Sequence, residues 1–278
     1  MKPVPKIVAI VNITEDSFSD GGRYLAPQAA ITHARALAAS GADWLELGPA
    51  SSNPDATPVS PEEQIARLGP VFEALRDDSL PLSVDATEPR VLAWALEAGA
   101  AMVNDIRGFP DPETQARLAS SEAAVVVVHS LLEEQRATRD IATPERVLAS
   151  IERFFEGRLT ELVRAGVSET RLIVDPGMGF FLGADPRASL AVLKRIPELR
   201  ARFGLPLFIS VSRKSFLQRI TGRSAQDAGA ATLAAELYSA QLGADYLRTH
   251  DAGALHDGLQ ILEALENLGE ATRTTQPD

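Results

Sequence analysis

Short apolar segments rich in β-branched residues recur along the chain and alternate with segments of helical periodicity. In the intervening segments, such as residues 61–77 and 144–166, the apolar positions return every three or four residues, as on one face of an α-helix. The apolar segments are too short for helices and predict strands. We predict strands at residues 7–11, 43–47, 81–84, 101–103, 124–128, 171–174, 206–211 and 244–247.

The order of these segments indicates an α/β fold. Strands that are apolar throughout are typical of parallel sheets covered by helices on both faces. Three helices end in a glycine directly before a strand, at Gly41, Gly99 and Gly243, where a left-handed residue can terminate the helix. Eight strand–helix units favour a (β/α)8 TIM barrel, and a doubly wound sheet is the alternative.

Composition narrows the functional classes. The 278 residues carry a formal net charge of −11, which argues against a general partner role with nucleic acid or an anionic membrane. The absence of cysteine excludes disulfides, thiolate metal sites and a cysteine nucleophile. The first residues do not resemble a secretion signal, and no apolar run is long enough for a membrane span, so we expect a cytoplasmic protein. We expect one domain over residues 1–266 and a disordered tail over 267–278.

In a barrel of this kind, chemistry is concentrated at the carboxyl ends of the strands. A single Asp or Asn at such a position usually caps a helix or makes a turn. Here nearly every predicted strand ends in a polar side chain, so the set predicts one polar pocket at the barrel mouth. The strand-end residues are Asn12, Glu46, Asp85, Asn104, Asp105, His129, Asp175, Arg213, Lys214, Arg248 and His250.

These side chains fall into two chemical groups. Asp85, Asn104 and Asp175 suit a ligand edge rich in N–H donors, such as an aminopyrimidinone, because an ionised carboxylate only accepts hydrogen bonds. The cationic group suits anionic oxygens of a phosphate or carboxylate. It comprises Arg248, His250 and the adjacent pair Arg213 and Lys214. The alternative for this pair is that both side chains lie on a loop and are only solvated.

Two glycine-containing loops follow predicted strands. Residues 12–24 include Gly21 and Gly22, and residues 175–183 include Phe180 and Phe181. Neither loop has the spacing of a phosphate-binding P-loop or a dinucleotide fingerprint. We expect the first to be a mobile loop over the site. The two phenylalanines are candidates for an apolar wall beside an aromatic ring, or alternatively for closing the barrel rim.

Six sequence blocks then identify a family resemblance. In order along the chain they are "NITEDSFSDGG", "SVDATEP", "NDIRGFPD", "DPGMGF", "SVSRKSF" and "RTHD". Their order and spacing resemble those of dihydropteroate synthases. The resemblance implies a (β/α)8 barrel, a homodimer and a reaction that requires Mg2+. In that reaction 6-hydroxymethyl-7,8-dihydropterin diphosphate condenses with 4-aminobenzoate to give 7,8-dihydropteroate and diphosphate.

The resemblance also implies roles for individual residues. The pterin would contact Asp85, Asn104, Asp175 and Lys214. The diphosphate would contact Asn12, Arg248 and His250, with Mg2+ also on Asn12. Phe180 and Ser215 would contact 4-aminobenzoate, and the catalytic groups would be Lys214, Arg248 and His250. We expect charge to develop on the departing diphosphate, a cation-like path at the methylene carbon, and no covalent enzyme intermediate.

The sequence departs from the residues usual in the family mainly in the segments expected near the second substrate. The departures are Glu15 for a proline, Asn53 for an arginine, Ala86 for a threonine, and Phe181 and Leu182 for Gly-Lys. Within the family the sequence resembles the sulfonamide-insensitive resistance enzymes most, so we expect weak inhibition by sulfonamides. Two alternatives stay open, a methyltransferase domain acting on a methylated folate and a homologue that only binds pterin.

Overall fold

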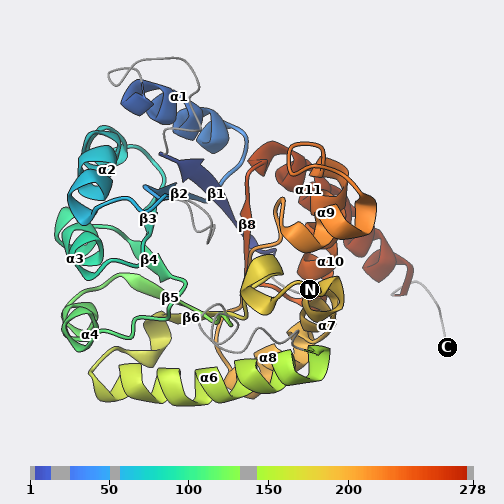
Figure 1. Cartoon of the computed structure of the whole chain (residues 1–278). Coiled ribbons are helices and arrows are strands. Elements are labelled where there is room, and N and C mark those ends of the chain that lie inside the picture. The colour runs from blue at the N-terminus through green and yellow to red at the C-terminus, as the bar shows by residue number, and fades with distance from the viewer. Residues whose placement is uncertain (1–3, 14–25, 51–56, 132–142, 274–278) are drawn as a thin grey trace.

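Eight parallel strands form the centre of the protein, and helices surround them (Figure 1). The computed structural model describes residues 4–13, 26–50, 57–131 and 143–273. The strands hydrogen-bond in the order β6-β5-β4-β3-β2-β1-β8-β7. They are β1 (Lys6–Asn12), β2 (Trp44–Gly48), β3 (Leu82–Asp85), β4 (Met102–Asp105), β5 (Ala124–Val128), β6 (Leu172–Asp175), β7 (Phe208–Ile209) and β8 (Tyr246–Thr249).

The two ends of this sheet meet, which closes the barrel. An isolated parallel bridge joins Val174 of β6 to Leu207, which immediately precedes β7. The N–H of Val174 also donates to the carbonyl oxygen of Pro206 at 3.0 Å. The predicted (β/α)8 barrel is therefore confirmed, as are all eight predicted strands to within a few residues at their ends.

The strand register brings the carboxyl ends of the strands to one rim. Asp85 at the end of β3 pairs with Asn104 of β4, and Asp175 at the end of β6 pairs with Val128. On the other side of β2, Asn12 at the end of β1 pairs with Gly48. Because all strands are parallel, the side chains at these ends project toward the same mouth.

Alternation along each strand separates two apolar regions. On β1, Val8 belongs to a small cluster inside the barrel, whereas its neighbours Ile7 and Ala9 pack in the larger core. That larger core lies between the strands and the surrounding helices, and the interior cluster also contains Met102 and Phe208. The period of two along a strand accounts for this division.

The helices are α1 (Ala26–Ala39), α2 (Pro61–Leu75), α3 (Pro89–Ala98), α4 (Pro112–Ala119), α6 (Pro144–Arg164), α7 (Pro186–Lys194), α8 (Ile196–Phe203), α9 (Ser215–Thr221), α10 (Gly229–Leu242) and α11 (Ala252–Arg273), with 3-10 helices η2 (Glu169–Arg171) and η3 (Gly179–Leu182). The φ angles of Gly41, Gly99 and Gly243 are 99°, 93° and 99°, which confirms the predicted left-handed helix ends.

The helical layer differs from a simple alternation of eight strands with eight helices. Two helices, α7 and α8, lie between β6 and β7, and α9 and α10 lie between β7 and β8. Pro197 accounts for the first division, because proline is tolerated in the first turn of α8 but could not continue the interior of α7.

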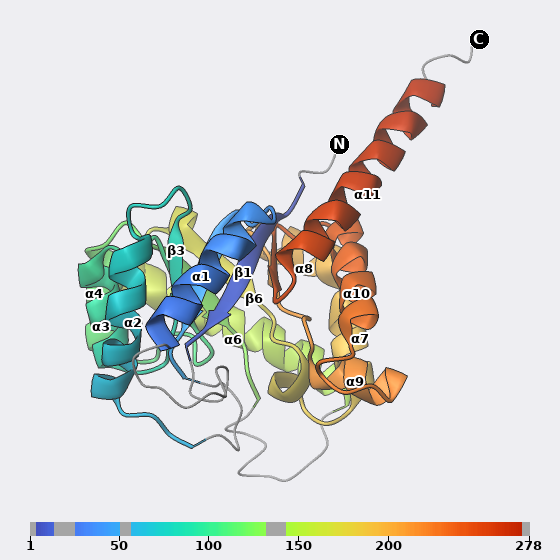
Figure 2. The same cartoon turned by 90° about the horizontal axis from the view of Figure 1, so that it is seen from above.

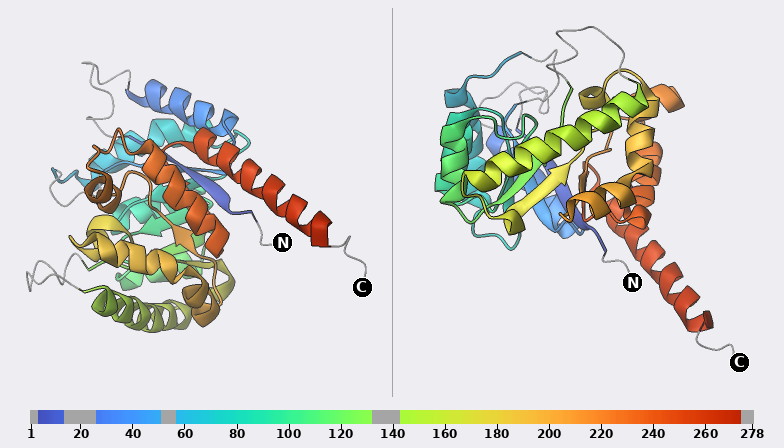
Figure 3. Two further views of the ribbon diagram at one scale, coloured as in Figure 1. Left: turned by 90° about the vertical axis from the view of Figure 1, so that its right-hand side faces the viewer. Right: turned by 90° about the horizontal axis from the view of Figure 1, so that it is seen from below.

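The last helix extends past residue 266, the C-terminal boundary expected from the sequence. Helix α11 continues to Arg273 and projects from the barrel (Figures 2 and 3). The polar composition of residues 267–273 suggested disorder. Residues 262–266, which precede them, are all Leu, Glu or Ala, and these residues have high helix propensity, so the helix continues from them. Residues 274–278 lie outside the described part of the chain. Among the described residues, none of the helices is long and apolar enough to cross a membrane.

Candidate active site

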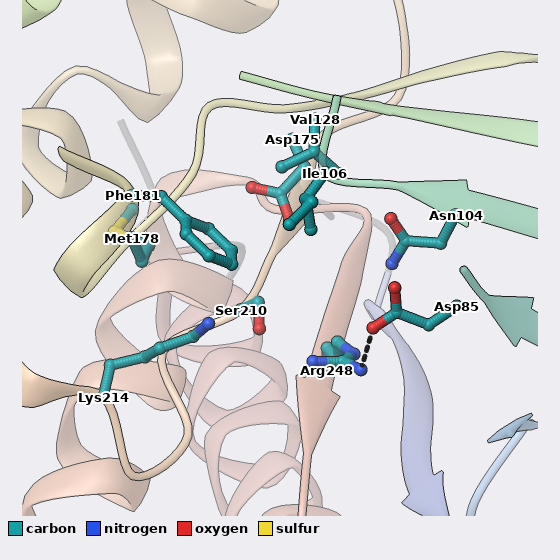
Figure 4. Close-up of a pocket in the computed structure, with 10 residues that line it drawn as sticks. All are labelled: Asp85, Asn104, Ile106, Val128, Asp175, Met178, Phe181, Ser210, Lys214 and Arg248. Atoms are coloured by element: carbon teal, nitrogen blue, oxygen red, sulfur yellow. Dashed lines mark hydrogen bonds and ion pairs between the residues drawn. The ribbon is translucent and has the colours of Figure 1, made fainter. Parts of the chain in front are cut away.

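A cavity opens at the mouth of the barrel, where the strands end (Figure 4). Carboxylate, amide and cationic side chains share it with apolar ones. Its lining residues are Asp85, Asn104, Ile106, Val128, Asp175, Met178, Phe181, Ser210, Lys214 and Arg248. All four residues assigned to the pterin from the sequence therefore line the same cavity, together with Arg248.

Asp175 presents a carboxylate with one oxygen already engaged. Its Oδ1 atom accepts a hydrogen bond from the N–H of Gly177 at 2.7 Å, which fixes the orientation of the carboxylate after β6. Gly177 has a φ of 76°, and a side chain there would clash with the backbone of His129. The glycine therefore allows the loop to turn closely enough for this bond, and the second oxygen of Asp175 remains for a ligand donor.

Asn104 lies beside Asp85, and its amide points into the cavity (Figure 4). The Nδ2 atom of Asn104 donates to Oε2 of Glu46 at 3.1 Å. The Oδ1 atom is buried and has no hydrogen-bond partner within the described part of the chain. A buried polar atom without a partner costs free energy, so this oxygen is suited to accept a hydrogen bond from a bound molecule.

Arg248 extends from β8 into the barrel rather than out over the rim. Its Nη2 atom lies 2.7 Å from Oδ2 of Asp85, and its Nε atom donates to Glu46. Only 14% of the side chain is exposed. Burial opposes the charge of Arg248, but Glu46 and Asp85 outweigh it and raise the pKa of the guanidinium. The structure thus places Arg248 against the residues assigned to the pterin, as well as near the end of β8.

Burial also changes the protonation of the two cavity aspartates. It raises the pKa of Asp85 to about 6, although the positive charges of Arg248 and Lys214 act in the opposite direction. Burial raises the pKa of Asp175 to about 6 as well, against the N–H of Gly177 and the charge of Lys214. Both groups can therefore ionise near neutral pH, and a ligand that donates to them favours the ionised form.

The adjacent cations Arg213 and Lys214 separate into two different environments. Lys214 lines the cavity, and its Nζ atom lies 4.4 Å from the centre of the Phe181 ring. Burial and the nearby charge of Arg248 lower the pKa of Lys214 to about 8. Arg213 is exposed, with a φ of 57° and its N–H bonded to Oγ1 of Thr232 at 3.0 Å. Lys214 therefore lies in the cavity, whereas Arg213 lies on the exposed side of the loop.

His250 lies close to the cavity but does not line it. Its Nδ1 atom is 2.9 Å from Oγ of Ser212, and the backbone N–H of His250 donates to the same oxygen at 3.2 Å. Burial, with the charges of Arg248, Arg213 and Lys214, lowers the pKa of His250 to about 3. The imidazole is therefore neutral at physiological pH. A serine that donates to Nδ1 leaves the imidazole proton on Nε2, available to an anionic ligand.

Neither of the two residues assigned to 4-aminobenzoate lines the cavity. Phe180 is 49% exposed and does not line the cavity, whereas its neighbour Phe181 does. Ser215 is buried as the first residue of α9, and a side chain at Gly179 would approach its Oγ atom to 3.1 Å. The apolar wall predicted from both phenylalanines is thus formed by Phe181, because η3 turns the adjacent ring outward.

Asp105 and His129 were wrongly placed in the pocket by their position after strands. Asp105 accepts hydrogen bonds from the N–H groups of Arg107 and Phe109, at 2.8 and 2.9 Å. His129 contacts the carbonyl oxygen of Pro176 and the hydroxyl of Ser150, and burial lowers its pKa to about 4. Both are buried and satisfied outside the cavity lining, so they organise loops.

Asn12 fits the single protein ligand expected for Mg2+. It is exposed at the end of β1, and its amide oxygen is the hard donor that this ion prefers. The described residues contain no cluster of three His, Cys, Asp or Glu side chains suited to a metal ion. A weakly anchored Mg2+ that also binds substrate phosphates is compatible with this donor set. Glu15 and Asn53, where the sequence departs from the family, lie outside the described residues.

The sequence interpretation named Glu46 as a strand-end residue but missed its contacts with Arg248 and Asn104. A fully buried glutamate within an apolar strand was the available signal, because such a charge is almost never buried without partners. It also missed Ile106, Met178 and Ser210 as lining residues. Apolar and small residues after strands resemble ordinary core residues in a sequence, so no comparable signal exists for them.

Comparison with known proteins gives the family. A family model described as pterin binding enzyme matches residues 8–250. Dihydropteroate synthase type-2 of Escherichia coli is 55% identical over 94% of this chain and 96% of that protein, and the type-3 protein of Escherichia coli is 50% identical over 94% and 99%. The solved structure of Xanthomonas albilineans dihydropteroate synthase with 4-aminobenzoic acid has a TM-score of 0.86 and 36% identity, covering 95% of this chain and 93% of that one. The chain belongs to the dihydropteroate synthase family of pterin-binding enzymes.

Proposed function

We propose that this protein catalyses the dihydropteroate synthase reaction. It condenses 6-hydroxymethyl-7,8-dihydropterin diphosphate with 4-aminobenzoate and releases diphosphate. The observation that carries the proposal is the single cavity that joins Asp85, Asn104, Asp175, Lys214 and Arg248 at the barrel mouth. The related Xanthomonas albilineans enzyme has been solved with 4-aminobenzoic acid and with 7,8-dihydropteroate, which supports the same substrates here.

The cavity provides complementary groups for the pterin ring. The free oxygen of Asp175 and the Oδ1 atom of Asn104 accept hydrogen bonds from N–H groups, and Lys214 donates to a ring acceptor. Phe181 packs against the lysine and adds an apolar surface for the bicyclic ring. The ring is thereby held with its methylene carbon directed toward the open mouth, where the second substrate enters.

The leaving diphosphate is stabilised at the rim. Neutral His250 can donate from Nε2, and Arg248, two residues earlier in the chain, adds positive charge from inside the barrel. Charge appears on the diphosphate as the methylene–oxygen bond breaks, and fixed donors there lower the barrier. The amine nitrogen of 4-aminobenzoate then forms the new bond to the methylene carbon and loses a proton. Mg2+, when bound to Asn12 and the substrate phosphates, supplies further charge neutralisation.

Three further properties belong to the same proposal. We assign the protein to the cytoplasm and expect it to act as a homodimer. We expect sulfonamides to inhibit it weakly, since Phe181, one of the residues that differ from those usual in the family, lines the cavity. Formation of 7,8-dihydropteroate from the two purified substrates tests the activity. Absence of product under conditions in which the folded protein binds both substrates contradicts it.

A further inference from the structure

Glu46 is a buried carboxylate that contacts the cavity residues from behind. It lies on β2 inside the barrel and has no exposed surface. Its Oε1 atom accepts from Nε of Arg248. Its Oε2 atom accepts from Oγ of Ser83 at 3.2 Å and from Nδ2 of Asn104 at 3.1 Å. Both oxygens are thus engaged by donors from three different strands.

The chemistry of these groups determines which way the Asn104 amide faces. An ionised carboxylate can only accept hydrogen bonds, so the NH2 group of Asn104 must face Glu46. The carbonyl oxygen of the amide is then the atom left for the cavity, and it is the buried oxygen that has no partner in the described residues. With the opposite orientation, two acceptors would face each other in a buried environment, which is unfavourable.

We propose that Glu46 is a positioning residue that makes Asn104 a hydrogen-bond acceptor toward the ligand. The cavity then selects a ligand edge that carries N–H donors at this point. The inference rests on the proposed function, because it assumes that the pterin occupies this cavity. Glu46 acts through Asn104 and Arg248 and is absent from the cavity lining.

The substitution Glu46→Gln tests this role because it changes one oxygen into an NH2 group and keeps the shape. Arg248 can only donate, so the carbonyl oxygen of the new glutamine must face Arg248. Its NH2 group then faces Asn104, whose amide has to turn over to accept from it. Asn104 would present a donor to the cavity in place of an acceptor. We expect affinity for 6-hydroxymethylpterin, measured by calorimetry, to fall about ten-fold or more.

A compensating change distinguishes positioning from general support of the fold. In the double variant Glu46→Gln with Asn104→Asp, the glutamine NH2 donates to one oxygen of the new aspartate. The other aspartate oxygen restores an acceptor to the cavity, and the net charge of the pair is unchanged. We expect the double variant to bind 6-hydroxymethylpterin within roughly three-fold of the parent. We expect it to unfold at a higher temperature than Glu46→Gln alone, because it keeps the buried negative charge that the single variant removes from the surroundings of Arg248.

Glu236 offers a matched control. It is also a buried glutamate, on α10, and burial raises its pKa to about 8, so its carboxyl group is largely protonated at neutral pH. It does not line the cavity. Glu236→Gln likewise replaces a buried carboxyl group by an amide, at a position outside the cavity lining. We expect it to leave the affinity for 6-hydroxymethylpterin within roughly two-fold of the parent.

The outcomes separate the inference from the function on which it rests. Loss of affinity in Glu46→Gln with recovery in the double variant supports the positioning role. Parent-like affinity in Glu46→Gln, or a folded double variant that binds no better than the single one, overturns it. If Glu46→Gln alone does not fold, the double variant decides, since a folded double variant without pterin affinity contradicts the inference. Failure of the parent to bind 6-hydroxymethylpterin contradicts the proposed function itself.

Discussion

The Nζ atom of Lys214 lies 4.4 Å from the centre of the Phe181 ring, although the two residues follow different strands. Phe181 belongs to η3 after β6, and Lys214 directly precedes α9 after β7. An ammonium over an aromatic face is attracted by the ring, more strongly when water is excluded. This contact holds the lysine inside the cavity, where Asp175 and Asp85 also attract its charge.

Replacing Lys214 with alanine should therefore lower both turnover and pterin affinity while leaving the fold intact. The side chain contributes to the ligand site more than to the core. Steady-state kinetics and calorimetry on the same preparation measure the two effects. Arg213→Gln is the matched control, because Arg213 is the neighbouring cation but is exposed to solvent. Normal catalysis by Lys214→Ala would show that Lys214, like Arg213, is a solvated charge on the loop and does not serve the site.

Asp175→Ala should weaken pterin binding strongly. The substitution removes an acceptor for the N–H groups of the ligand and leaves donors unpaired in a buried site, a loss of about 1–3 kcal/mol or more. This corresponds to a rise in Kd of about 5- to 150-fold. A loss of affinity could come from the missing ligand acceptor or from the missing hydrogen bond to the Gly177 loop. Asp175→Asn separates these causes, since its side-chain oxygen can still accept from the N–H of Gly177. Unchanged affinity of the alanine variant in calorimetry would remove Asp175 from the ligand site.

Pterin binding should be strongest between about pH 6 and pH 8. Burial raises the pKa of Asp85 and Asp175 to about 6, so both lose their acceptor charge as the pH falls through that value. Burial lowers the pKa of Lys214 to about 8, so the cation is lost as the pH rises through that value. Kd measured across this range checks both limits.

The two limits can be assigned with one variant. Lys214→Arg keeps a cation at every pH in this range, because guanidinium does not deprotonate there. We expect the loss of affinity above about pH 8 to disappear in this variant, while the loss below about pH 6 remains. An alkaline limit that is unchanged in Lys214→Arg would show that another group titrates there.

The barrel itself was predictable because its signal is local and repeated. The strands are apolar and short, and the glycines at positions 41, 99 and 243 end helices by a conformation that glycine adopts easily. The extension of α11 was missed because it depends on the balance of weak helix propensities. The division of α7 from α8 was missed although Pro197 marks it in the sequence.

The site was predictable in its membership more than in its geometry. Position after a strand identified Asp85, Asn104 and Asp175, but it also selected His129, which is satisfied in the loop structure. The direction of a side chain depends on backbone angles that the sequence pattern does not specify. The separation of Lys214 from its exposed neighbour follows from a left-handed residue between β7 and α9 and could not be read from composition.

Sulfonamides should inhibit this enzyme poorly relative to its affinity for 4-aminobenzoate. These drugs resemble the substrate but carry a bulkier tetrahedral sulfonyl group, and a small obstruction can reject them while the flat carboxylate still fits. We expect ordinary micromolar-scale Michaelis constants for 4-aminobenzoate, as enzymes typically show. The test compares the inhibition constant of sulfamethoxazole with the Michaelis constant for 4-aminobenzoate, both measured on one preparation. Comparable values of the two constants would identify a sulfonamide-sensitive enzyme.

The central claim is that one cavity joins a pterin diphosphate to 4-aminobenzoate, and diphosphate release tests it most directly. Purified protein should release diphosphate only when both substrates and Mg2+ are present. Removal of Mg2+ with EDTA should abolish the release, and adding Mg2+ back should restore it. Release that proceeds at the full rate without 4-aminobenzoate, or without Mg2+, would contradict the account, as would no release from folded protein that has bound both substrates.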